Sequence, residues 1–101
     1  MNSVNLVGRL AKDVTLTAGE KEGCILTVAV QGYGDKVDFI PCSAWGKQAE
    51  YLDKYSHKGD LLSVSGRLTT YKDKDNNFKM GVVVNTVSVL SHAKPKDVEN
   101  K

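Results

Sequence analysis

The sequence has no long hydrophobic run, no cysteine pair at metal-ligand spacing and little net charge. No stretch approaches the ~18 uninterrupted apolar residues that a membrane-spanning helix needs, so we expect no membrane association. The first residues lack a basic segment followed by an apolar one, so no secretory signal is expected. The net charge is only +2. Affinity for nucleic acid must therefore depend on where the charges lie rather than on their sum.

Candidate metal ligands are few. A zinc site would have to use Cys24, Cys42, His57 and His92 together, and their spacing fits none of the usual patterns. We therefore expect no metal and no cofactor. Both cysteines are expected to be reduced core residues of a cytoplasmic protein.

Catalytic motifs are also missing. The sequence holds no Walker motif and no dinucleotide fingerprint. No serine–histidine–aspartate arrangement or pair of carboxylates can be assembled from the spacing, and acid–base chemistry needs a buried, perturbed group. We therefore expect that the protein is not an enzyme.

What the sequence does contain is alternation typical of strands. Its 101 residues predict one domain, and 41% hydrophobic with 26% charged residues is ordinary globular composition. Period-two patterns predict five strands, at 3–10, 24–31, 36–45, 60–70 and 79–90. Gly8 interrupts the first pattern and indicates a bulge or a bend. One helix is predicted at 46–57, where Ala49, Leu52 and Tyr55 recur at helical spacing, with Gly59 following as its C′ residue.

The remaining segments are polar. Residues 11–23 are interpreted as a loop or loose hairpin, 31–35 as a glycine-rich turn and 71–78 as a polar hairpin tip. Residues 91–101 are interpreted as a flexible C-terminal tail behind a domain of residues 1–90. The element order predicts an all-β fold, a five-stranded Greek-key OB-fold barrel with one short helix between strands three and four. A generic small barrel or sandwich is the alternative.

The third predicted strand separates two kinds of side chain. Ile40 and Cys42 share one parity, which is expected to face the core, whereas Phe39 and Trp45 share the other. Two large aromatic residues are therefore expected on the outer face. Pro41 could change this assignment, because it cannot donate to a strand ladder and could introduce a bulge.

A sequence-tolerant binder of single strands needs flat π surfaces for bases and cations along the backbone path. Both are predicted on the same surfaces. The candidate aromatic residues are Phe39, Trp45, Tyr71 and Phe78. The candidate cationic residues are Arg9, Lys36, Lys47, Arg67, Lys72, Lys74 and Lys79.

Each candidate also has a purely structural interpretation. Trp45 could cap the barrel core, and Phe39 could lie in the core or between subunits. Tyr71 could be an ordinary cross-strand partner. The lysine–aspartate alternation at 72–75 could be a solvated turn. We assign Tyr51 and Tyr55 to helix packing.

Four runs of residues resemble bacterial-type single-stranded DNA-binding proteins, in order and with family-like spacing over residues 2–90. They are residues 2–10 (NSVNLVGRL), 38–50 (DFIPCSAWGKQAE), 55–60 (YSHKGD) and 65–68 (SGRL). Each run is weak alone, but four in sequence are specific. The resemblance implies an OB-fold that assembles into a homotetramer. It also implies binding of single-stranded DNA without sequence specificity, in replication, recombination and repair.

The resemblance also implies stacking roles for individual residues. The stacking aromatic residues of the family correspond to Phe39 and Trp45 and, more loosely, to Tyr71. A further family aromatic residue, in the turn after the second strand, corresponds to Tyr33. Phe78 is a candidate only from its place at the hairpin.

Two departures from the family pattern stand out. Cellular members usually end in an acidic tip with a final aromatic residue, which binds replication and repair proteins, and residues 97–101 (DVENK) have no such tip. We expect either a trimmed chain or a short version such as a bacteriophage encodes. Phenylalanine and tyrosine also stand where the family often has tryptophan, which predicts weaker stacking per base. The competing hypothesis is an OB-fold replication assembly factor that acts mainly through protein contacts.

Overall fold

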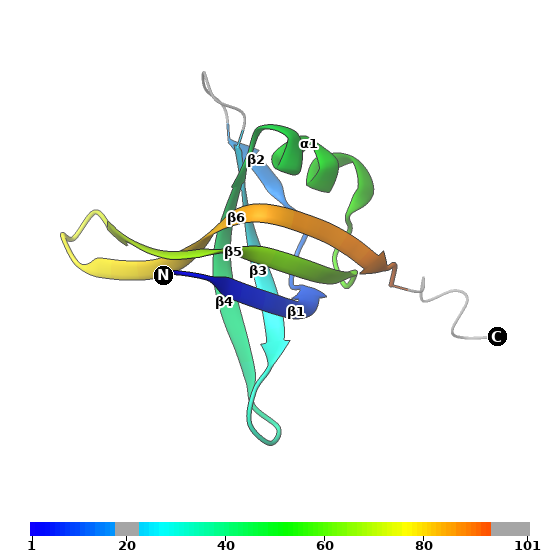
Figure 1. Ribbon diagram of the computed structural model, residues 1–101, viewed down its shortest axis with the longest axis horizontal. Helices are drawn as coiled ribbons and strands as arrows, with labels where there is room; N and C mark the ends of the chain where they lie inside the picture. The colour runs from blue at the N-terminus through cyan, green and yellow to red at the C-terminus, as the bar shows by residue number, and fades with distance from the viewer. Residues whose placement is uncertain (18–22, 94–101) are drawn as a thin grey trace.

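A computed structural model describes residues 1–17 and 23–93 of the chain. These residues form six strands and one helix, joined by turns and loops (Figure 1). They are β1 (Val4–Leu10), β2 (Thr15–Thr17), β3 (Gly23–Gln31), β4 (Val37–Trp45), α1 (Gly46–Tyr55), β5 (Leu61–Lys72) and β6 (Phe78–Ser91).

Five of the strands close into a barrel. The sheet order is β1-β5-β6-β4-β3-β2, and an additional pairing between β1 and β3 joins the two sides. β4 and β6 run parallel, and the other paired strands run antiparallel. The helix lies between β4 and β5, which are the third and fourth strands of the barrel in chain order. The predicted OB-fold is confirmed.

The segment predicted as a loop or loose hairpin contains a short strand. Thr15–Thr17 (β2) pairs antiparallel with the start of β3, with Thr15 opposite Ile25. The alternation of three residues is too short to distinguish a strand from a loop by pattern alone. Residues 18–22 lie outside the described part of the chain.

The barrel interior is apolar and follows the predicted parity. Its fully buried side chains include Leu26 and Cys42, which are paired across β3 and β4, as well as Val28 of β3 and Ala44 of β4. The alternation along residues 60–70 predicts that Leu68 faces the core with Leu62 and Val64, and for Leu68 this prediction is wrong. Leu68 is 44% exposed, because β5 continues past the barrel there and its backbone bonds to the Asn2 side chain instead of covering the core.

The predicted irregularity at Gly8 is a point of close backbone approach. β1 pairs with β5 along most of its length, and at Arg9 and Leu10 it also pairs with β3. A Cβ at residue 8 would collide with the Ala29 carbonyl oxygen. Glycine at this position therefore allows β1 to pair with both β5 and β3, which closes the barrel.

The helix ends earlier than predicted. It stops at Tyr55, and Ser56 caps it by donating its backbone N–H and its hydroxyl to the Leu52 carbonyl at 3.0 and 2.6 Å. Gly59, predicted as the C′ residue, has a φ of 93° but lies in the following turn, where Asp60 N–H donates to the His57 carbonyl.

β5 and β6 extend beyond the barrel as a two-stranded arm, which projects to the left in Figure 1. A turn closes the arm, in which the Asp73 carboxylate accepts the backbone N–H groups of Asp75 and Asn77 at 2.9 and 3.0 Å. Asn76 takes a φ of 67°, a conformation that asparagine tolerates. The predicted polar hairpin tip is therefore a turn that side-chain-to-backbone hydrogen bonds close.

The predicted tail 91–101 begins within the described residues. Ser91 is the last residue of β6, and Ala93 N–H donates to Asp60 at 2.8 Å. Residues 94–101 lie outside the described part. Within residues 1–17 and 23–93, the one helix, at 10 residues, falls short of the length needed to span a membrane.

Candidate nucleic-acid interface

The outer face of β3 and β4 carries the two aromatic residues predicted there. Phe39 is paired with Ala29, and Trp45 with Gly23, so each large ring stands opposite a small residue. Phe39 is 63% exposed and Trp45 50% exposed. Pro41 lies between them on the same face, without a bulge that would reverse the parity. A core role for either ring is therefore wrong in this chain.

Tyr71 extends the same face onto the arm. Ser43 of β4 is paired with Val83 of β6, which is paired with Arg67 of β5. Alternate residues share a face, so Thr69 and Tyr71 follow Arg67 on that face. Tyr71 is 50% exposed.

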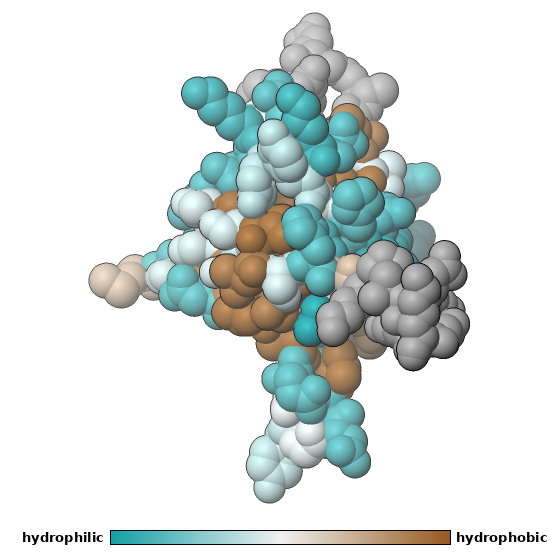
Figure 2. Space-filling model, turned by 90° about the vertical axis from the view of Figure 1, so that its right-hand side faces the viewer, coloured by the Kyte–Doolittle hydropathy of each residue, from teal (hydrophilic) through white to brown (hydrophobic). Residues whose placement is uncertain are grey.

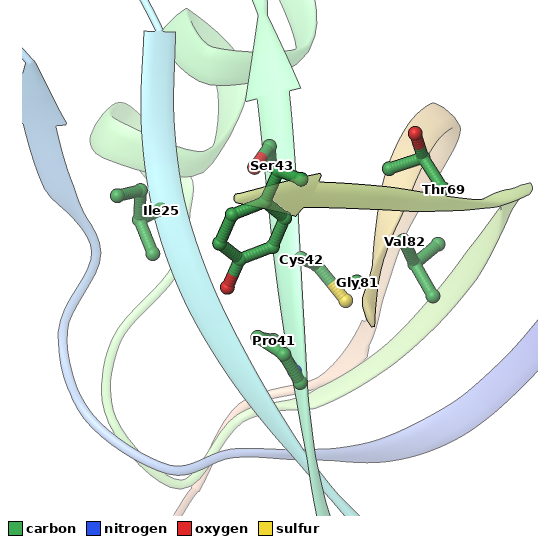
Figure 3. A pocket seen from close by; sticks show the side chains of 8 residues that line it. Ile25, Pro41, Cys42, Ser43, Thr69, Gly81 and Val82 are labelled. Carbon is green, nitrogen blue, oxygen red and sulfur yellow. The ribbon is translucent and has the colours of Figure 1, made fainter. Parts of the chain in front are cut away.

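A pocket lies between Tyr71 and the barrel. Figure 3 shows Ile25, Pro41 and Ser43 on one side of this pocket and Thr69 and Val82 on the other. Its volume is about 210 Å³, and its lining is mostly apolar. Gly81 forms part of the lining, and a Cβ there would lie 3.6 Å from the Tyr71 ring. We call Phe39, Trp45, Tyr71 and this pocket the aromatic face.

Phe78 is not brought together with the other aromatic residues. It is paired with Lys72, one step along the ladder from the Tyr71–Lys79 pair, so it points to the opposite face of the arm. There it is 71% exposed, and the Lys72 ammonium lies 5.1 Å from its ring centroid. Met80 and Leu68 share this second face.

The cationic candidates surround the aromatic face unevenly. Arg67 lies on it, and Lys79 is paired with Tyr71. Lys47 follows Trp45 by two residues, in the first turn of α1. Lys36 lies 3.8 Å from the Asp38 carboxylate, so part of its charge is compensated.

The other candidate cations lie further from the aromatic rings or have structural partners. Lys74 is an exposed residue of the arm turn, and Lys72 lies over Phe78. Arg9 donates to the Gly59 carbonyl at 3.0 Å, which ties β1 to the turn after α1. Its guanidinium therefore already has a structural role.

Tyr33 stands apart at the end of the β3–β4 hairpin. It is 97% exposed in a turn closed by hydrogen bonds from Gly32 N–H to the Lys36 carbonyl and from Lys36 N–H to the Tyr33 carbonyl. Gly34 has a φ of 64° in this turn. The tyrosine projects from the barrel but on a different element from the rings of the aromatic face.

Sequence reasoning missed Ile25. This residue is 54% exposed on β3, opposite Ser43, and lines the pocket. The sequence does carry the signal, because alternation along residues 24–31 puts Cys24 and Leu26 on the inward face and therefore Ile25 on the outward one. A large aliphatic residue with outward parity beside two aromatic residues marks a contact surface.

The cysteines lie below this surface. Cys42 is 1% exposed, and burial raises its pKa to about 11. The pKa of Cys24 is also raised, by burial first and by the charge of Asp53 second. Because both pKa values are raised, both thiols are protonated at neutral pH and neither is activated as a nucleophile.

These features define a class of protein: an OB-fold barrel that exposes aromatic rings with cations near them, an arrangement suited to unpaired nucleic acid. The model of the single-strand binding protein family matches residues 1–91. The chain belongs to that family.

Three individual relatives that carry the name single-stranded DNA-binding protein support this family assignment. The chain is 38% identical to single-stranded DNA-binding protein 2 of Clostridium acetobutylicum, over 99% of this chain and 84% of the relative. It is 40% identical to single-stranded DNA-binding protein 1 of the same organism, over 78% and 82%. It is also 40% identical to the single-stranded DNA-binding protein of Clostridium tetani, over 89% and 70%. None of these names indicates a catalytic activity.

Proposed function

We propose that this protein binds single-stranded DNA without sequence specificity, by stacking bases on Phe39, Trp45 and Tyr71. The observation that carries the proposal is that three aromatic rings, each at least half exposed, lie on one outer face that runs from the barrel onto the arm. Bases of any sequence present a π surface, so such a face tolerates every sequence. Family membership supports the same function.

The expected magnitudes make stacking the main contribution. One base stacked on an aromatic side chain contributes roughly 1–3 kcal/mol, so three give a gross ~3–9 kcal/mol before the strand is ordered. Lys79 is paired with Tyr71, and Arg67 lies on the same face of β5, so both would bind phosphates. Lys36, Lys47, Lys72 and Lys74 would extend this contact in both directions, with Arg9, Tyr33 and Phe78 as outer contacts.

The biological role that follows is protection of exposed single strands during DNA replication, recombination and repair in the cytoplasm. Binding of this kind needs no catalysis. Replication and recombination proteins are the expected protein partners, because they act on the same strands.

A homotetramer is the proposed assembly. Val7 of β1 and Leu90 of β6 are both more than half exposed on the two strands that flank β5. Val7, Ser63 and Ser88 lie across from one another, so mostly small side chains would allow a second copy to approach closely. Figure 2 shows apolar residues gathered on the side of the molecule where β1 and β6 end and β5 begins.

The test combines binding and size. Fluorescent dT oligomers of several tens of nucleotides are titrated with protein and followed by anisotropy, with a duplex of equal length as control. Light scattering after size exclusion gives the mass of the free and bound protein. Tight binding of dT with weak binding of duplex is expected. Weak binding of both, with a dimeric mass, would favour the assembly-factor hypothesis instead.

A further inference from the structure

A cluster of two histidines and an aspartate lies on the side of the barrel at the exit of α1. His57 and Asp60 belong to the turn between α1 and β5, and His92 follows the last residue of β6. The three residues offer ligand atoms within 4.8 Å of one another. Spacing in the sequence could not indicate this cluster, because 32 residues separate Asp60 from His92 and only the fold joins them.

Asp60 is held in a fixed orientation. It is 1% exposed, and its Oδ1 accepts the Ala93 N–H at 2.8 Å while its Oδ2 accepts the His57 N–H at 2.9 Å. Two backbone donors from two separate segments therefore set the position of the carboxylate. A ligand that is oriented in this way needs little reorganisation when a cation binds.

The two imidazoles converge on the same carboxylate oxygen. His92 Nδ1 lies 3.0 Å and His57 Nδ1 4.0 Å from Asp60 Oδ2. Ligands at ~2.0–2.1 Å from a tetrahedral zinc ion lie roughly 3.3 Å apart, a spacing that these two distances bracket. Both imidazole side chains are well exposed, at 64% for His92 and 75% for His57, so small rotations can equalise the spacing.

We propose that His57, Asp60 and His92 form a binding site for Zn²⁺, with water completing the coordination. Two imidazoles and one carboxylate are donors that suit this ion. The site would join the turn after α1 to the end of β6, so bound metal would stabilise the fold by holding these two segments together. It is separate from the aromatic face and independent of the proposed DNA binding.

The first test measures affinity and stability in the full chain. Zn²⁺ is titrated calorimetrically into metal-free wild type, His57→Ala, His92→Ala and the control Lys58→Ala, whose side chain lies in the same turn outside the cluster. One equivalent per chain is expected for wild type and the control, with affinity at least ~10-fold lower in each histidine variant. Zn²⁺ should also raise the thermal midpoint of wild type and the control only.

The second test asks whether residue 92 itself is a ligand. Co²⁺ added to His92→Cys should produce a thiolate-to-cobalt absorption band, because a cysteine at position 92 would coordinate the ion. Glu50→Cys is the matched control, since residue 50 is exposed on α1, seven residues before His57 and outside the cluster. The native cysteines are buried and should give no band.

Three results would overturn the proposal. They are no Zn²⁺ binding by wild type, binding that both histidine variants retain at full affinity, and equal absorption bands in the two cysteine variants. In each case the cluster would be only a hydrogen-bonded junction. Circular dichroism of each metal-free variant shows that it folds, so loss of binding reports on the ligands.

Discussion

The indole ring of Trp45 lies over the backbone of Gly23, its partner across β3 and β4. A Cβ at residue 23 would collide with the six-membered ring of the indole. The missing side chain on β3 therefore makes room for the largest side chain on β4. One face of the ring is supported by the barrel, and half of the side chain stays exposed for a base.

Gly23→Ala should displace this ring and weaken DNA binding. The added methyl group would overlap the ring, and because the half-exposed side chain can move outward, the ring would leave the position in which it can stack. The protein contains one tryptophan, so its emission spectrum reports the displacement directly, and anisotropy with dT oligomers reports affinity. Trp45→Ala should lower affinity by ~1–3 kcal/mol, about ten- to hundredfold. An unchanged emission spectrum and unchanged affinity in Gly23→Ala would contradict this arrangement.

The two faces of the arm should differ in their effect on DNA binding. Tyr71 shares its face with Arg67, whereas Phe78 points the other way. Tyr71→Ala and Phe39→Ala should each weaken dT binding by ~1–3 kcal/mol. Phe78→Ala is the matched control, with an expected smaller loss, because its ring lies away from the aromatic face. A loss for Phe78→Ala as large as that for Tyr71→Ala would mean that the strand wraps around the arm.

The outward orientation of Phe39 and Trp45 on β4 could be predicted from the sequence, because the face that a strand residue occupies depends only on its position relative to its neighbours in the same strand. Ile40, Cys42 and Ala44 could fill the interior only if Phe39 and Trp45 faced out, and this is what the structure has. Gly8 was identified as an irregularity for a similar reason. Local chemistry was sufficient in both cases.

Features that depend on long-range pairing could not be predicted. Phe78 flanks the hairpin like Tyr71 in the sequence, but the register of the arm puts the two on opposite faces. Leu68 has inward parity on a part of β5 that has left the barrel. The proximity of His92 to Asp60 likewise depends on where β6 ends in space.

Removing single cations should change the salt dependence of binding in a position-specific way. For single strands, log K falls with log[NaCl] by about 0.7 for each phosphate neutralised. Arg67→Ala and Lys79→Ala should each reduce the slope by ~0.7, because Lys79 is paired with Tyr71 and Arg67 lies on the same face of β5 as Tyr71. Lys54→Ala, in the last turn of α1, is the control and should leave the slope unchanged. Anisotropy titrations between low and moderate NaCl give the slopes, and equal slopes in all variants would place the phosphates elsewhere.

Charge on the outer face of β1 should disrupt the proposed assembly. Val7 is an apolar residue that is 55% exposed in the single chain, and Val7→Glu replaces it with a carboxylate. Burying an unpaired charge between subunits is strongly unfavourable, so the variant should have a smaller mass in light scattering. Leu16→Glu makes the same chemical change on β2, away from this surface, and should keep the wild-type mass. A monomeric wild type, or an unchanged mass for Val7→Glu, would exclude an interface at this position.

The cysteines should report whether the barrel below the aromatic face stays closed. A thiol reacts through its thiolate, and burial raises the pKa of Cys42 from 9.0 to about 11. Both thiols should therefore react slowly with a chromogenic disulfide reagent at pH 8 in the native protein and rapidly in denaturant. The raised pKa means that folding favours the protonated thiol, so its contribution to stability is complete below pH 9 and is lost as the pH rises through about 11. Cys42→Ala should remove that part of the alkaline destabilisation, measured as the urea midpoint from pH 8 upward, while Cys24→Ala should keep it. Rapid labelling of Cys42 in the native protein at pH 8 would show that the pocket beside Tyr71 opens into the core, because Cys42 forms part of its lining.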